Sequence, residues 1–110
     1  LETVLLNLLD NALRAAPQDS RIRVSAAPSE PGVTVQVDDA GPGIPEAFRA
    51  RVFERFYRLD HGRASASGGS GLGLAIVKHT IMLHGGTIRA GTSDLGGARF
   101  TFTLPATPPA

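Results

Sequence analysis

A chain of 110 residues is long enough for one domain and too short for two. Its 42% hydrophobic and 19% charged residues exclude wholesale disorder, and a net charge of +1 gives no bulk attraction for nucleic acid or an anionic membrane surface. The absence of cysteine excludes disulfides, Cys-ligated zinc and a thiol nucleophile, and the short apolar runs exclude a bilayer-spanning segment. A start inside a helical pattern, without Met, favours a piece of a longer protein.

The first third of the chain predicts a helix followed by a β-hairpin. Apolar residues recur at helical spacing at Leu1, Val4, Leu5, Leu8, Leu9 and Ala12. The helix should end near Ala16, because Pro17 disfavours helical geometry in the residue before it. Residues 21–27 and 33–38 alternate as strands, and the turn-rich residues 28–32 join them.

The middle of the chain predicts a loop, a short helix and a mobile segment. Residues 39–45 form a Gly/Pro loop, and residues 46–56 predict a helix with Phe48, Val52, Phe53 and Phe56 as its apolar set. Residues 57–69 are rich in Gly, Ser and Ala and have almost no apolar anchor. A long irregular segment of this kind is often functional.

The last third predicts a second helix and a second hairpin. Residues 71–83 are apolar on most sides, which predicts a central helix that Gly85 and Gly86 end. Residues 87–90 and 98–104 predict strands. The order α-β-β-α-α-β-β then suggests two hairpins in one sheet with helices on one face, a two-layer α/β sandwich.

The first predicted helix carries an unusual polar face. Asn7, Asn11 and Arg14 fall at i, i+4 and i+7, and so within about 60° of one another, away from the apolar stripe. Amide oxygens can bind Mg²⁺ and an arginine can hold phosphate oxygens, which favours a cation and phosphate face. Plain surface polarity with a helix cap is the alternative.

Two glycine-rich segments are candidates for ligand contact. In residues 39–44, a carboxylate follows a strand directly, where it could accept a hydrogen bond from an exocyclic amine while the glycines admit a flat ligand. A simple turn explains the same residues. Residues 69–74 open a helix, where free amides and the helix dipole suit an oxyanion, although a flexible linker is the alternative. Arg58 lies near the start of the mobile segment, and the loop that follows it could fold over a ligand.

These segments occur together in one order, and that order is more specific than any single one. They are Asn7-Leu-Leu-Asp-Asn11, Asp39-x-Gly41-x-Gly43-Ile44, Phe53-Glu-Arg-Phe56-Tyr57-Arg58, Gly69-Ser-Gly71-Leu72-Gly73-Leu74, His84-Gly-Gly and Gly96-Gly-Ala-Arg-Phe100. The order resembles the catalytic, ATP-binding domain of bacterial sensor histidine kinases, in the superfamily that also holds gyrase, Hsp90 and MutL. The resemblance covers about residues 1–105 and leaves 106–110 as a frayed tail.

The resemblance implies the superfamily's α+β two-layer sandwich, the Bergerat ATP-binding fold, with a mixed, mostly antiparallel sheet and helices on one face. It also implies ATP and Mg²⁺ as cofactors, with Asn7 and Arg58 as catalytic residues and Asn11 as the metal ligand. The implied nucleotide-binding residues are Asn7, Asn11, Arg14, Asp39, Gly41, Gly43, Ile44, Tyr57, Arg58, Gly69, Ser70, Gly71, Leu72, Gly73 and Leu74. Asp39 would bind the adenine amine, and residues 57–70 would form a lid.

The implied activity is transfer of the γ-phosphoryl group to a histidine on a separate dimerising, phosphoacceptor helical domain, for relay to a response regulator. The residues after His61, His79 and His84 do not fit an acceptor, so this chain would only donate. The resemblance implies a cytoplasmic domain of a parent anchored in the bacterial inner membrane, with no membrane or nucleic-acid contact of its own. The alternatives are a nucleotide-binding pseudo-kinase and a serine-directed, anti-sigma-factor-type kinase. Ala15 stands where the family often has an aromatic residue.

Overall fold

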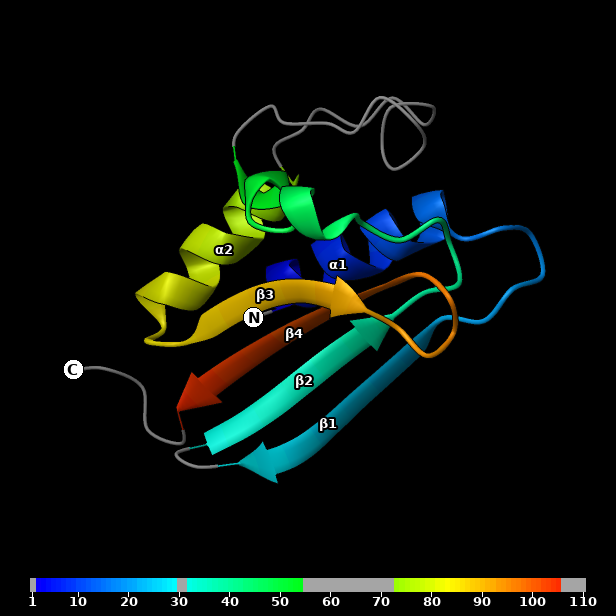
Figure 1. Ribbon diagram of the computed structural model, residues 1–110. Helices are drawn as coiled ribbons and strands as arrows, with labels where there is room; N and C mark the ends of the chain where they lie inside the picture. Colours follow the sequence, from blue (N-terminus) through cyan, green and yellow to red (C-terminus); the bar gives the residue numbers. More distant parts are fainter. Residues whose placement is uncertain (1, 30–31, 55–72, 106–110) are drawn as a thin grey trace.

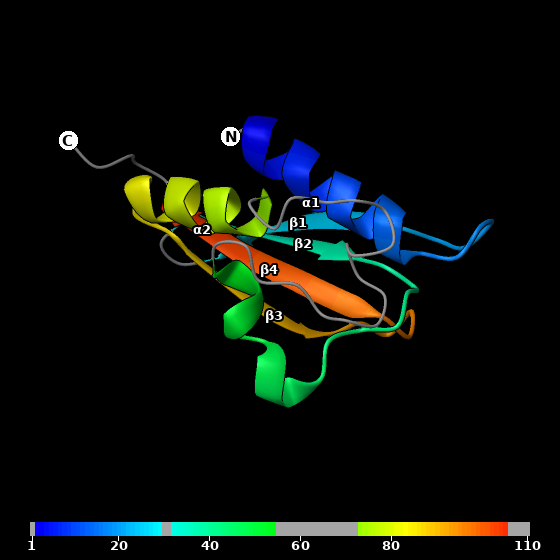
Figure 2. The ribbon, with the colours of Figure 1, turned by 90° about the horizontal axis from the view of Figure 1, so that it is seen from above.

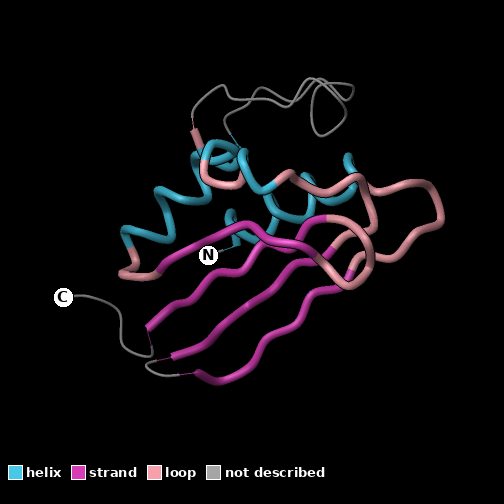
Figure 3. Tube along the Cα trace, in the orientation of Figure 1, coloured by secondary structure: helices cyan, strands magenta, loops and turns pink. Residues whose placement is uncertain are grey.

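The computed structural model describes residues 2–29, 32–54 and 73–105. They form one sheet with the helices on one of its faces (Figures 1 and 3), which confirms the predicted two-layer α+β sandwich. The elements are α1 (Glu2–Ala15), β1 (Arg23–Ser29), β2 (Gly32–Asp38), the 3₁₀ helices η1 (Glu46–Phe48) and η2 (Arg51–Phe53), α2 (Gly73–Leu83), β3 (Thr87–Thr92) and β4 (Ala98–Pro105).

The sheet joins two antiparallel hairpins through their inner strands. Its order is β1-β2-β4-β3, and each pairing among these four strands is antiparallel. The predicted turn at 28–32 was too long, because Pro28 and Ser29 belong to β1 and pair with Val33 and Gly32. Proline is tolerated there since β1 is an edge strand of the described sheet.

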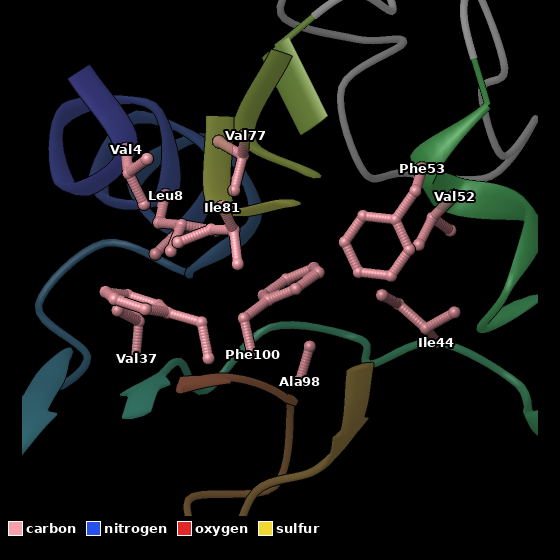
Figure 4. Close-up of a cluster of buried hydrophobic side chains, with 12 residues drawn as sticks. Val4, Leu8, Val37, Ile44, Val52, Phe53, Val77, Ile81, Ala98 and Phe100 are labelled. Atoms are coloured by element: carbon pink, nitrogen blue, oxygen red, sulfur yellow. The ribbon is translucent and has the colours of Figure 1, made fainter. Parts of the chain in front are cut away.

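Alternation along the inner strands directs one row of side chains toward the helices. Val37 on β2 and Phe100 on β4 are register partners, and each is 1% exposed. Figure 4 shows how they meet side chains from both helices and from η2. Phe53 of η2 packs edge-on against Phe100, with ring centroids 6.0 Å apart and planes at 82°. The core therefore lies between the sheet and its single helical layer.

The two helices cover different strands of the sheet. α1 packs on β2, whereas α2 packs on β3 and β4, and the two helices also contact each other (Figure 2). The buried side chains of α1 are Val4, Leu8 and Ala12, which are three members of the predicted stripe. α1 ends at Ala15, one residue before the predicted end.

Helix α2 is less central than its apolar sequence predicts. Val77 and Ile81 are fully buried, but Ile76, Met82 and Leu83 are 45%, 60% and 66% exposed. A helix in the outer layer of a two-layer fold touches the sheet along one stripe only, so its other apolar side chains remain accessible.

The end of α2 confirms the role predicted for its two glycines. Gly85 has φ of 81° and donates to the carbonyl of Met82, and the N–H of Gly86 donates to the carbonyl of Ile81 at 2.9 Å. This pair of bonds is the Schellman motif, and it turns the chain directly into β3.

The helix predicted over residues 46–56 was wrong for residues 46–54, where η1 and η2 replace it, and its last two residues lie outside the described ranges. Their hydrogen bonds span three residues, as from Phe48 N–H to the carbonyl of Pro45 at 2.9 Å, and Glu54 then adopts an extended conformation. Short segments commonly close with this tighter pattern, and here it buries the consecutive residues Val52 and Phe53.

Gly86, directly before β3, and Gly91, within β3, should respond oppositely to substitution by alanine. A Cβ at Gly86 would overlap the carbonyl oxygen of Thr103, whereas a Cβ at Gly91 would meet nothing within 4 Å. We expect Gly86→Ala to destabilise the fold by about 1–3 kcal/mol, as overpacking does. Gly91→Ala should be neutral or stabilise β3 by about 0.5 kcal/mol. Urea denaturation of both variants checks this, and equal midpoints would contradict it.

Candidate functional site

A buried carboxylate stands where β2 ends. Asp39 is 1% exposed, and its Oδ1 accepts hydrogen bonds from the backbone N–H groups of Gly41 at 2.9 Å and Ala98 at 3.1 Å. The backbone of Asp39 also donates to the carbonyl of Ala98 at 3.0 Å and accepts from the N–H of Gly97 at 3.1 Å. These bonds hold the carboxylate in one orientation, as recognition of a ligand N–H group requires.

The backbone around Asp39 requires glycine at the predicted positions Gly41 and Gly43 and also at Gly97. A Cβ at Gly41 would lie 2.6 Å from the carbonyl oxygen of Ala15, at the end of α1. Gly43 has φ of 78°, a conformation that favours glycine. A Cβ at Gly97 would collide with Oδ1 of Asp39. The loop after β2 is therefore in close contact with both α1 and the turn before β4.

The predicted amide face of α1 meets the start of α2. Asn7 donates from Nδ2 to the carbonyl of Thr3 at 3.0 Å, which fixes its amide group. Its Oδ1 would lie 3.5 Å from a Cβ placed on Gly73, the first residue of α2. Asn7 and Gly73 are 66 residues apart in sequence, so the fold brings together two of the predicted nucleotide contacts.

Asn11 has an unsatisfied polar atom beside this junction. Its Nδ2 is buried and has no hydrogen-bond partner among the described residues. An unpaired buried amide donor costs about 1–3 kcal/mol and would be satisfied by an acceptor such as a phosphate oxygen. Mg²⁺ prefers oxygen ligands together with phosphate oxygens, and the amide side chains of Asn7 and Asn11 fit that donor chemistry. Among the described residues, no three His, Asp or Glu side chains form a metal-binding cluster.

The other predicted residues divide into described and undescribed ones. Arg14 forms an ion pair with Asp10, with Nε and Oδ2 3.0 Å apart. Ile44 is buried in the core, and Leu74 is partly buried against it. The remaining residues lie outside the described ranges: Tyr57, Arg58, Gly69, Ser70, Gly71 and Leu72, together with the predicted lid and His61.

A second buried carboxylate lies next to Asp39 on the other face of the sheet. Asp38 is 0% exposed, and its Oδ1 accepts from Nε of Arg99 at 2.7 Å. Arg23 lies 3.6 Å from its Oδ2 and also hydrogen-bonds Asp94, which is 3.3 Å from Arg99. The hydrogen bond from Arg23 lowers the pKa of the Asp94 carboxyl, and the same bond raises the pKa of Arg23.

The structure adds functional contacts to which the sequence analysis gave no role. Gly97 and Ala98 lie in the motif 96–100, which was noted without a function, yet they provide the backbone groups that hold Asp39. Arg49 donates to the carbonyl of Ile44 at 3.1 Å and to the hydroxyl of Thr92 at 2.7 Å. It thereby ties the loop after β2 to the end of β3. Neither role has a local sequence signal.

Residues 1–108 match the family described as histidine kinase-, DNA gyrase B- and HSP90-like ATPase. The chain therefore belongs to this family. Its fold superposes on the mycobacterial sensor histidine kinase MprB with a TM-score of 0.86 and 38% identity, covering 97% of this chain and 72% of that one. The ATP-binding domain of PrrB from Mycobacterium tuberculosis gives a TM-score of 0.70 and 35% identity, covering 99% of this chain and 69% of that one. The predicted resemblance to sensor histidine kinases is confirmed.

Curated relatives are similar over a part of their length. The chain is 45% identical to the sensor-like histidine kinase SenX3 of Mycobacterium tuberculosis over 106 residues, which are 96% of this chain and 26% of SenX3. It is 45% identical to the sensor histidine kinase CpxA of Escherichia coli over 105 residues, which are 96% of this chain and 22% of CpxA. The chain thus spans about a quarter of these relatives. Neither described α-helix is long and apolar enough to cross a bilayer.

The contact between Arg23 and Asp94 should be visible in a pH titration. Because the folded-state pKa of Asp94 is lowered, the contact stabilises the fold above the unfolded pKa and is lost as the pH falls through the folded value, in a window below about pH 4. Arg23→Gln should raise the pKa of Asp94 toward its ordinary value. Carboxyl-carbon NMR titration of both proteins measures this, and coincident Asp94 curves would contradict the assignment.

Proposed function

We propose that this chain is the catalytic domain of a sensor histidine kinase, which binds Mg-ATP and donates the γ-phosphoryl group to a histidine on a separate domain. The observation that carries the proposal is the orientation of Asp39. Its buried carboxylate, held by two backbone N–H groups, suits hydrogen bonding to the exocyclic amine of adenine. Gly41, Gly43 and Ile44 would line the purine site beside it. The domain would comprise residues 1–105.

The phosphates would lie between α1 and the start of α2. Asn7, one helical turn before Asn11, lies next to Gly73, and the first N–H groups of a helix favour an anion. Asn11, with Asn7 beside it, would hold the Mg²⁺ ion, which would neutralise phosphate charge when bound. Arg14 would change partners from Asp10 to a phosphate. Arg58 and the lid that residues 57–70 would form complete the proposed site.

Phosphoryl transfer needs positioning and charge neutralisation more than covalent chemistry from the protein. We assign those tasks to the amide face, to the N–H groups at the start of α2 and to the arginines. An acceptor imidazole needs little activation, so the absence of an assigned general base is compatible with the reaction. The partners would be a dimerising phosphoacceptor helical domain and, through it, a response regulator. We also propose a cytoplasmic position for this domain, in a parent that is anchored in the membrane.

Asp39→Asn should weaken ADP binding. The asparagine would present an amide donor to the amine of the purine or to the N–H groups that now reach Oδ1, which leaves buried groups unpaired. We expect a loss of about 1–3 kcal/mol, or about 5- to 150-fold in Kd. Calorimetry with ADP and Mg²⁺ measures it. Asp19→Asn, which changes an exposed carboxylate in the same way, is the matched control. An affinity of Asp39→Asn equal to that of the control would remove Asp39 from the purine site.

The chain alone should not become phosphorylated by γ-labelled ATP. None of His61, His79 and His84 is followed by the acidic residue of an acceptor histidine, and His84 Nδ1 lies 2.8 Å from the carbonyl oxygen of Thr80. We expect acid-labile label only after a separate phosphoacceptor hairpin domain is added, and on that domain. Label on any of the three histidines would contradict the donor role. ADP binding without transfer to any added domain would indicate a pseudo-kinase instead.

A further inference from the structure

Asp38 and Asp39 are consecutive buried carboxylates that point to opposite faces of the sheet. Successive side chains of a strand alternate between faces, and Val37 belongs to the core, so Asp38 lies on the face away from the helices. Asp39 returns to the helical side, where its loop meets the end of α1 through Gly41. Burying two adjacent carboxylates is costly unless each is fixed by compensating groups.

Asp38 forms ion pairs with Arg23 and Arg99, and both arginines also pair with Asp94. We call these four side chains the outer charge cluster. Arg23, Asp38 and Arg99 are direct register neighbours on β1, β2 and β4, with charges in the order positive, negative, positive. Asp94 joins both arginines from the turn between β3 and β4. The cluster thus connects three strands and that turn at the end of the sheet where Asp39 lies.

The same turn holds Asp39 from the other side. It leads into Gly97, whose N–H bonds the carbonyl of Asp39, and Gly97 precedes Ala98, whose N–H bonds the Asp39 carboxylate. The turn is closed by the bond from Ser93 N–H to the carbonyl of Gly97 at 2.9 Å. Asp94 is the residue directly after Ser93. Asp94 therefore belongs to the turn that leads into the backbone groups orienting the Asp39 carboxylate.

We propose that the outer charge cluster positions the Asp39 carboxylate and so sets the selectivity of the site for an amino-purine over an oxo-purine. This inference rests on the proposed function. The four residues are positioning residues, because they lie on the opposite face from the purine site and act through the turn. Of the four side chains only Asp38 is fully buried, and Asp94 is 65% exposed, so its two ion pairs contribute little to stability. A fixed geometry at the strand ends is what the cluster supplies.

The test compares ADP with inosine diphosphate, whose base carries a carbonyl in place of the amine. The variant is Asp94→Asn, because Asp94 is exposed and its loss should not prevent folding; thermal denaturation checks that the variant is folded. Selectivity is the Kd for inosine diphosphate divided by the Kd for ADP. We expect this ratio to fall about threefold or more in the variant, which corresponds to a weakened hydrogen bond to the amine. Affinity for inosine diphosphate should change less than affinity for ADP. A purely structural role would weaken both nucleotides alike.

Two further variants complete the design. Asp94→Glu keeps the carboxylate and should recover most of the selectivity, whereas the control Asp19→Asn should leave it at the wild-type value. An unchanged ratio in Asp94→Asn, beside a selective wild-type chain, would overturn the positioning role and leave the proposed function intact. A wild-type chain that does not prefer ADP to inosine diphosphate would instead overturn the role of Asp39 in the proposed function.

Discussion

Two backbone N–H groups, from Gly41 and Ala98, hold the carboxylate of Asp39 at the end of β2. This arrangement requires β4 to begin directly beside the end of β2, and the pairing of Asp38 with Arg99 sets that alignment. It also requires a residue without a side chain at Gly97, because a Cβ there would occupy the space of the carboxylate oxygen. The sheet register and one glycine therefore decide whether the carboxylate can face a purine.

The helical layer places the other end of the proposed nucleotide site. Burial of Val4 and Leu8 from α1 and of Val77 and Ile81 from α2 against the same sheet brings the helices into contact. Their polar faces then meet at Asn7 and Gly73. Apolar burial thus stabilises a half-buried polar junction, and the buried Asn11 amide nitrogen, which has no partner among the described residues, is available to a ligand acceptor.

Asp38, the last residue of β2, and Asp39, directly after it, have different kinds of hydrogen-bond and ion-pair partners. Backbone N–H groups compensate Asp39 on the helical side, whereas guanidinium groups compensate Asp38 on the outer side. The donor of Ala98 is fixed by the sheet and that of Gly41 by the loop after β2, so the Asp39 carboxylate that we assign to the ligand keeps one orientation. Arginine side chains suit the structural partner, since their planar donors bridge several elements at once. The alternation of a β-strand is enough to separate these two roles.

The sequence by itself determined α1, both hairpins, the glycine stop after α2 and the family, because each depends on neighbouring residues or on motif order. It also indicated Asn7, Asn11 and Asp39 as residues with chemistry. Only the tertiary structure decided that residues 46–53 form 3₁₀ turns, that one stripe of α2 is buried, and that Ala98 holds Asp39. Asp39 and Ala98 are 59 residues apart, and no local pattern encodes a contact made by strand register.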